Sequence, residues 1–241
     1  MYSYDVLKEP RGFVKFIQIL LAICAFATTC DFSATVNMSV KCYGRQNDTI
    51  RPNYTFSYPF RINENLLPIC PKSTNQTSTS EEPHYSGKNS YGDFSTSSQF
   101  FVFTGVLVFL YCIVAVILYI VYSDEYVNND RPSKADFILS ILLTVLWFIA
   151  SSAWADGVQQ FKGYTAPERI FNEMKDWEKH DLHVSVRPTY GGLNASLIFG
   201  FTNILLWAAS LWFIWKETSW ARQNDSLIDP GSVSAADGSP M

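Results

Sequence analysis

Four long apolar runs alternate with polar segments along the 241 residues of the chain. The runs extend over residues 13–30, 100–122, 137–154 and 195–215. A helix rises 1.5 Å per residue, so about 20 apolar residues cross the roughly 30 Å hydrocarbon core of a bilayer. The runs are continuous and lack a stripe that repeats every 3.6 residues, which favours contact with lipid over burial in a soluble core. The sequence therefore predicts an all-α membrane protein, a bundle of four transmembrane helices with two lumenal loops.

Charged side chains are almost absent from these runs. Lys15 lies near the beginning of the first, where its ammonium is expected to snorkel to the headgroups. Transporters place ionisable groups inside their bundles, so that class is not indicated. The amides of Gln18 and Asn203 are expected to hydrogen-bond a neighbouring helix. Ser196 and Gly200 have the small-xxx-small spacing of close helix contacts, and with Asn203 they are predicted to support packing within or between subunits.

The polar stretch between the first two runs contains four Asn-X-Ser/Thr sequons, which begin at Asn37, Asn47, Asn53 and Asn75. Such sites are glycosylated in the lumen, so we predict that residues 31–99 are lumenal. Lys and Arg are too evenly distributed to decide the orientation. With four spans, residues 1–12 and the tail 216–241 are then cytoplasmic, and residues 155–194 form a second lumenal loop. Asn37 and Asn194 lie close to the bilayer, so the sites predicted to be used are Asn47, Asn53 and Asn75.

The lumen is oxidising, so lumenal cysteines are expected to pair where geometry allows. Cys42 and Cys70 bracket the first loop, and a bridge between them would contribute about 3–4 kcal/mol. Cys30, at the lumenal end of the first span, leaves three alternatives: it competes as a partner, cross-links to another subunit, or stays an unpaired interfacial thiol. Cys24 and Cys112 lie within spans, where they are expected to act as small apolar residues.

The loops carry weaker signals of secondary structure. Alternation at residues 35–40 and 54–60 predicts a small β-element. Residues 72–93 are polar enough for a flexible linker, and the tail 216–241 has the composition of a disordered segment. Phe171, Met174, Glu178 and Leu182 recur at helical spacing, which predicts a short amphipathic helix in the second loop.

Candidate chemistry is sparse. His180 and His183 stand among acidic residues, but the spacing matches no zinc signature, and a solvated charged helix is favoured. The sequence contains no glycine-rich phosphate loop and no nucleophile elbow, so we expect neither an enzyme nor a cofactor. A net charge of −4 gives no indication of a nucleic-acid partner.

Two features concern the N-terminus. A cleavable signal peptide is the alternative reading of the first apolar run, whose length favours a retained helix. Tyr4-Asp5-Val6-Leu7 has the form of a tyrosine-based sorting motif, in which the side chains of Tyr4 and Leu7 would enter pockets of a clathrin adaptor.

Several segments, in this order, resemble the synaptophysin (physin) family, whose members carry a MARVEL-type four-helix membrane domain. They cover all four spans and much of the first loop. The matching segments are KEPRGFVKF (Lys8 to Phe16), AFATTC (Ala25 to Cys30), SYPFRINE (Ser57 to Glu64), FSTSSQFFVF (Phe94 to Phe103), VFLYCIVAVILYI (Val108 to Ile120), WFIASSAWADG (Trp147 to Gly157), LNASLIFGFTNILLW (Leu193 to Trp207) and WKETSW (Trp215 to Trp220).

The resemblance implies a non-enzymatic protein of transport or synaptic-type vesicles, with cytosolic termini. It further implies a cholesterol-associated homo-oligomer that binds the vesicle SNARE synaptobrevin and assists vesicle biogenesis, exocytosis and recycling. Cys42 and Cys70 fall where the family's first lumenal bridge lies. The second lumenal loop has no cysteine, and Thr29 stands where the family has one, with Cys30 next to it. The tail lacks Tyr-Gly-rich repeats, so the chain resembles a short-tailed, pantophysin- or synaptoporin-like branch or a divergent invertebrate form.

Two other classes are compatible with four spans. An oligomeric ion channel is one, although uncharged spans supply no selectivity ring. A junctional four-span adhesion protein is the other, and in that case the lumenal loops would bind a neighbouring cell.

Overall fold

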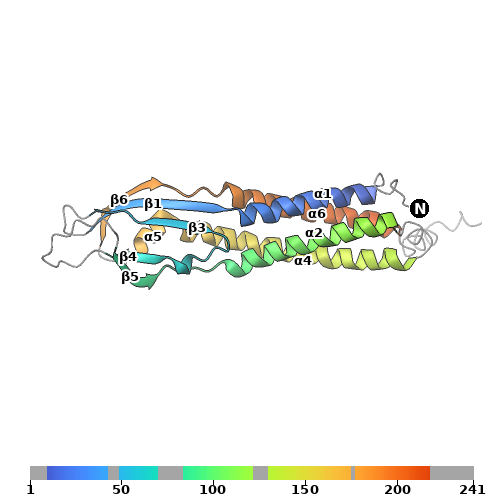
Figure 1. Cartoon of the computed structure of the whole chain (residues 1–241), viewed down its shortest axis with the longest axis horizontal. Coiled ribbons are helices and arrows are strands. Elements are labelled where there is room, and N and C mark those ends of the chain that lie inside the picture. The colour runs from blue at the N-terminus through green and yellow to red at the C-terminus, as the bar shows by residue number, and fades with distance from the viewer. Residues whose placement is uncertain (1–9, 43–48, 70–83, 122–129, 175–176, 218–241) are drawn as a thin grey trace, which may run out of the picture. The chain divides into compact units, whose positions relative to one another are not determined.

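The computed structural model describes residues 10–42, 49–69, 84–121, 130–174 and 177–217. In this part of the chain four helices are long and apolar enough to cross a membrane. They are α1 (Pro10–Cys30), α2 (Ser95–Val121), α4 (Asp130–Tyr164) and α6 (Gly191–Glu217) (Figure 1). Many large apolar side chains of these helices remain exposed, as expected where the solvent is lipid. The prediction of four long helices is confirmed.

Helix α4 is much longer than the apolar run that predicted it. It contains 35 residues and extends beyond the run at both ends. It ends at Tyr164, shortly before the short helix α5 (Pro167–Glu173). Ala166, which precedes Pro167, has an extended backbone, because the proline ring excludes the helical conformation from the residue before it.

A four-stranded antiparallel sheet is formed by residues of both predicted lumenal loops. Strand β1 (Ser33–Cys42) pairs with β2 (Thr49–Ile50) and β3 (Asn53–Ser57) in one continuous register. Strand β6 (Trp177–Val186) pairs with β1 along its other edge. The β-element predicted at residues 35–40 and 54–60 is confirmed, because alternate side chains of β1 and β3 are buried.

The predicted amphipathic helix around residues 171–182 is wrong. Of its four marker residues, Phe171 alone lies on α5, and Glu178 and Leu182 lie on β6. Pairing with β1 gives this segment backbone partners that its helical spacing did not reveal. Within the predicted linker, residues His84–Asn89 form β5, which pairs with β4 (Leu66–Ile69) after the 3-10 helix η2 (Ile62–Glu64). Residues 72–83 of that linker lie outside the described residues.

The chain divides into two compact units. The first consists of residues 1–24, 104–149 and 199–241, and the second of residues 25–103 and 150–198. Each of the four long helices contributes residues to both units.

The core of the second unit is a group of aromatic rings around Phe161, which is 0% exposed. Five ring centroids lie within 6.3 Å of the Phe161 centroid, those of Phe32, Phe56, Phe60, Phe94 and Tyr190. They come from the start and interior of the sheet and from the segments that lead into α2 and α6. One side chain of α4 thus joins both loops of this unit in one core.

The start of α2 is fixed by Asp93. Its carboxylate accepts a 2.9 Å hydrogen bond from the backbone N–H of Ser95, the first helical residue. Hydrogen bonds from the Ser95 side chain and backbone hold the pKa of the Asp93 carboxyl below its usual range. Because the pKa is lowered in the folded state, this cap stabilises the helix at neutral pH and loses its effect only as the pH falls below the ordinary carboxyl range.

Asp93→Ala is therefore expected to lower the free energy of unfolding by about 0.5–2 kcal/mol, the range found for lost helix caps. Asp93→Asn should lose less, because its side-chain oxygen still accepts the hydrogen bond. Thermal unfolding of the purified protein in detergent at neutral pH measures both. Equal losses for the two variants would contradict a capping role.

Candidate functional site

The sequence predicted that the ammonium of Lys15 reaches the lipid headgroups, and this prediction is wrong. Lys15 is 1% exposed, inside the first unit. Its Nζ atom lies 4.8 Å from the ring centroid of Tyr111 on α2 and 4.5 Å from the ring of Trp207 on α6. Nζ has no hydrogen-bond partner among the described residues. The two ring faces attract the ammonium, and a desolvated contact of this kind contributes about 2 kcal/mol or more.

Asp136 supplies the opposite charge. It stands one residue before the predicted third span, but it lies within α4 and is 9% exposed. Its carboxylate accepts hydrogen bonds from the hydroxyls of Tyr111 and Tyr119. The Tyr111 hydroxyl also lies 3.2 Å from Ser140 Oγ. The bundle thus contains two ionisable groups, although the near absence of charge from the apolar runs did not indicate any inside it.

We refer to Lys15, Tyr111, Tyr119, Asp136 and Trp207 as the charge cluster. Tyr111 is its centre, because its ring faces the cation while its hydroxyl donates to the anion. The charges of Lys15 and Asp136 attract each other through space. An isolated charge in this environment costs several kcal/mol, and a paired one much less. Ionisable residues within a membrane bundle are rare and mark functional sites by default.

Gln18 extends the polar interior of the same unit. Its amide Nε2 donates a 3.2 Å hydrogen bond to Ser210 Oγ on α6, and Cys112 Sγ on α2 donates to its Oε1 at 3.8 Å. The prediction that Gln18 hydrogen-bonds a neighbouring helix is confirmed.

The three predicted packing residues all lie on the buried side of α6. In the second unit, Ser196 Oγ accepts a 3.1 Å hydrogen bond from the indole of Trp154. In the first unit, the carbonyl of Gly200 accepts one of 2.8 Å from the indole of Trp147. Asn203 is 0% exposed, and its amide atoms have no partner among the described residues. These positions lie inside the chain's own fold. Their role in helix packing stays a prediction.

Ser196→Ala removes the acceptor of the buried Trp154 indole. We expect the free energy of unfolding to fall by about 1–3 kcal/mol, the cost of a buried donor without a partner. Thr202→Ala, at an exposed position of the same helix, is the matched control and should have little effect. Fluorescence-detected size exclusion after heating would measure both variants, and equal midpoints would count against the role of Ser196.

The structure places the other residues considered in the sequence as follows. Asn53 is the first residue of β3 and is exposed, and Cys42 is the last residue of β1. His180 and His183 lie on β6 rather than on a helix. Cys30 is an exposed free thiol, and Cys112 a buried one. Five predicted residues lie outside the described residues: Tyr4, Leu7, Asn47, Cys70 and Asn75. The Cys42–Cys70 bridge, the use of Asn47 and Asn75, and the sorting motif therefore stay predictions.

The charge cluster was missed because its members are far apart in the sequence. One signal was available: Tyr111 and Tyr119 stand in an otherwise apolar helix, and a buried tyrosine hydroxyl requires a partner. Asp136 is the carboxylate nearest to the predicted start of the third span.

A comparison with protein families finds that residues 6–213 match the MARVEL membrane-associating domain. The match includes the four long helices, the sheet and the charge cluster. Proteins with this domain are typically non-enzymatic membrane proteins, and they generally act in membrane apposition and vesicle trafficking. Since the match extends over most of its length, this chain belongs to the MARVEL family.

Proposed function

We propose that the protein organises the membrane and cargo of transport or synaptic-type vesicles, in their formation, exocytosis and recycling. The observation that carries this proposal is the MARVEL match over all four helices, together with the synaptophysin-like segments that follow the family's order. The proposed place is a vesicle membrane, with both termini in the cytosol and the sheet in the lumen.

Self-association is part of the proposal. The polar side chains that join helices in this chain, such as Gln18 and Ser196, are buried and bonded within it. Contacts between copies would therefore use the exposed apolar surfaces of the helices, with packing as the driving force, because lipid removes the hydrophobic incentive. Further proposed partners are the vesicle SNARE synaptobrevin and, through Tyr4 and Leu7, clathrin adaptors.

Cholesterol association is supported by a groove in the first unit. Residues of α2 and α4 line a cavity of about 270 Å³ with mostly apolar walls, including Val114, Leu118 and Leu139. Tyr111 and Asp136 are its polar residues. One face of a sterol ring system would lie against the apolar walls, while its hydroxyl would donate to the Asp136 carboxylate.

Vesicle fractionation tests the proposal. Epitope-tagged protein in secretory cells should sediment with small vesicles that contain synaptobrevin, and proximity labelling from the N-terminus should mark vesicle and adaptor proteins on the cytosolic side. Protease added to sealed vesicles should remove a C-terminal tag and spare the loops. Accumulation at lateral cell contacts would instead indicate the adhesion protein, and protection of the tag would refute the orientation.

An oligomeric channel is the second candidate, because the charge cluster places a cation and an anion inside the bundle. Under this alternative, Lys15→Met and Asp136→Asn would each change unitary conductance or ion selectivity in planar bilayers. Purified wild-type protein that gives no unitary currents would exclude the channel and leave the first proposal intact.

A further inference from the structure

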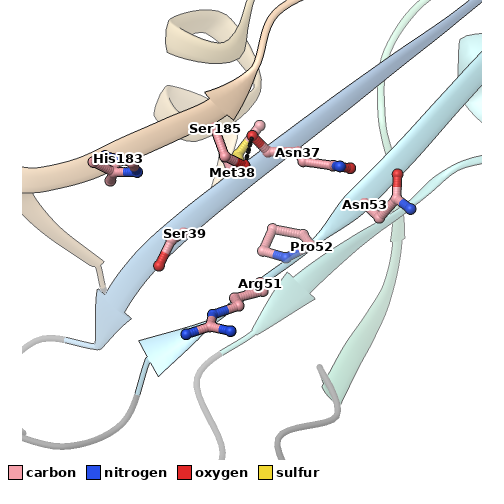
Figure 2. A pocket seen from close by; sticks show the side chains of 8 residues that line it. All are labelled: Asn37, Met38, Ser39, Arg51, Pro52, Asn53, His183 and Ser185. Carbon is pink, nitrogen blue, oxygen red and sulfur yellow. Dashed lines mark hydrogen bonds between the residues drawn. The ribbon is translucent and has the colours of Figure 1, made fainter.

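A cavity of about 450 Å³ lies on the sheet of the second unit, between β1, β6 and the segment that joins β2 to β3 (Figure 2). Most of its lining residues carry polar groups. They include Asn37 and Ser39 from β1, His183 from β6 on one side of β1, and Arg51 and Asn53 on the other side. The pairing of β1 with β6 shifts register between Asn37 and Met38, and such a bulge redirects side chains.

Two sequons meet in this cavity. Asn37-Met38-Ser39 and Asn53-Tyr54-Thr55 lie on paired strands, and Asn37 and Asn53 are partners in the register. Side chains of opposed residues in an antiparallel pair share a face, with Cβ atoms about 4.5–5.5 Å apart. Two branched sugar chains cannot leave the sheet from positions this close. The native fold therefore accommodates a glycan on one of the two asparagines.

Burial distinguishes the two asparagines. Asn53 is exposed, so its side chain is accessible for the attachment of a glycan. The Oδ1 atom of Asn37 is fully buried and has no hydrogen-bond partner among the described residues. The backbone carbonyl of Asn37 also accepts a 3.1 Å hydrogen bond from Ser185 Oγ of β6. The side chain of Asn37 is therefore less accessible to a glycan than that of Asn53.

We infer that Asn53 carries the glycan and that its first N-acetylglucosamine occupies this cavity. Arg51 and His183 are exposed and offer donors to sugar oxygens at the rim of the cavity. Attachment at Asn53 gives the sugar an effective concentration in the millimolar range or above, so modest contacts suffice to hold it.

The inference rests on the lumenal orientation proposed above, and sequon variants test it first. Thr55→Ala removes the Asn53 sequon and leaves the asparagine in place, so one glycan should disappear from the gel pattern. Ser39→Ala removes the Asn37 sequon, and Thr35→Ala alters the same face without touching any sequon; both should retain the wild-type pattern. Wild-type protein without any glycan would overturn the orientation. Glycans elsewhere but none at Asn53 would overturn the inference alone.

The position of the first sugar in the cavity is tested by deglycosylation with two enzymes, on protein that carries high-mannose glycans. Endoglycosidase H leaves one N-acetylglucosamine on Asn53. Peptide N-glycosidase F leaves none and converts the asparagine to aspartate, and the Thr55→Ala variant, which keeps the asparagine, controls for that change. The endoglycosidase product should have the same melting temperature as the untreated protein. The melting temperatures of the N-glycosidase product and of the Thr55→Ala variant should be about 2–4 °C lower. Arg51→Ala should reduce this difference. Equal melting temperatures for the two enzyme products would overturn the seating of the sugar.

Discussion

Replacement of Asp136 by leucine should cause one of the two largest losses of stability in the chain, about 3–5 kcal/mol in the free energy of unfolding. The variant leaves Lys15 as an uncompensated cation at 1% exposure, and it takes the acceptor from the hydroxyls of Tyr111 and Tyr119. A lower yield of monodisperse protein and a lower melting temperature in detergent are the expected measurements.

A double-mutant cycle shows whether the loss comes from the unpaired charge. Lys15→Met combined with Asp136→Leu removes both charges, so it should recover a large part of the stability that Asp136→Leu loses. Asp156→Asn, at an exposed acid of the same helix, is the matched control and should behave as wild type. If the double variant loses as much as the two single variants together, the charges act independently and the cluster does not function as a unit.

Phe161→Ala is the second substitution with a large expected effect. Truncation of a fully buried phenylalanine typically costs about 3–5 kcal/mol, through lost transfer energy and the cavity left behind. Here the cavity would open among rings from the sheet and from the segments before α2 and α6. We expect early loss of structure in the second unit, seen as faster hydrogen exchange in β1, β3 and β6.

The control for this prediction is Phe148→Ala on the same helix. Phe148 is 55% exposed, so its truncation removes lipid contact but opens no cavity inside the protein. Its hydrogen-exchange pattern should match that of the wild type. Uniform acceleration in both variants would mean that α4 itself has been weakened and that Phe161 has no particular role in joining the loops.

The four helices were predictable because a bilayer leaves few alternatives. Backbone groups in hydrocarbon must bond within their own segment, so an uncharged run of about 20 residues is sufficient evidence for a helix. The strands β1 and β3 were also predictable from the sequence, because one face of each is buried and the other is not. These predictions rest on local patterns that the environment enforces along the whole segment.

The remaining features depend on partners far along the chain. The spacing of Phe171 and Met174 favoured a helix as far as Leu182, but β1 offers that segment a strand partner. Lys15 stands where a lysine usually snorkels, but the rings of Tyr111 and Trp207 and the charge of Asp136 favour its position inside. Neither the strand β6 nor the buried position of Lys15 can be predicted from neighbouring residues in the sequence.

Strand β1 begins three residues after α1 ends, and it holds β3 on one edge and β6 on the other. The segment between α1 and α2 and the segment between α4 and α6 therefore contribute strands to one sheet and share its backbone bonds. Exchange of a single loop between related proteins would break that pairing. Chimaeras intended to separate the roles of the loops need both regions from the same parent.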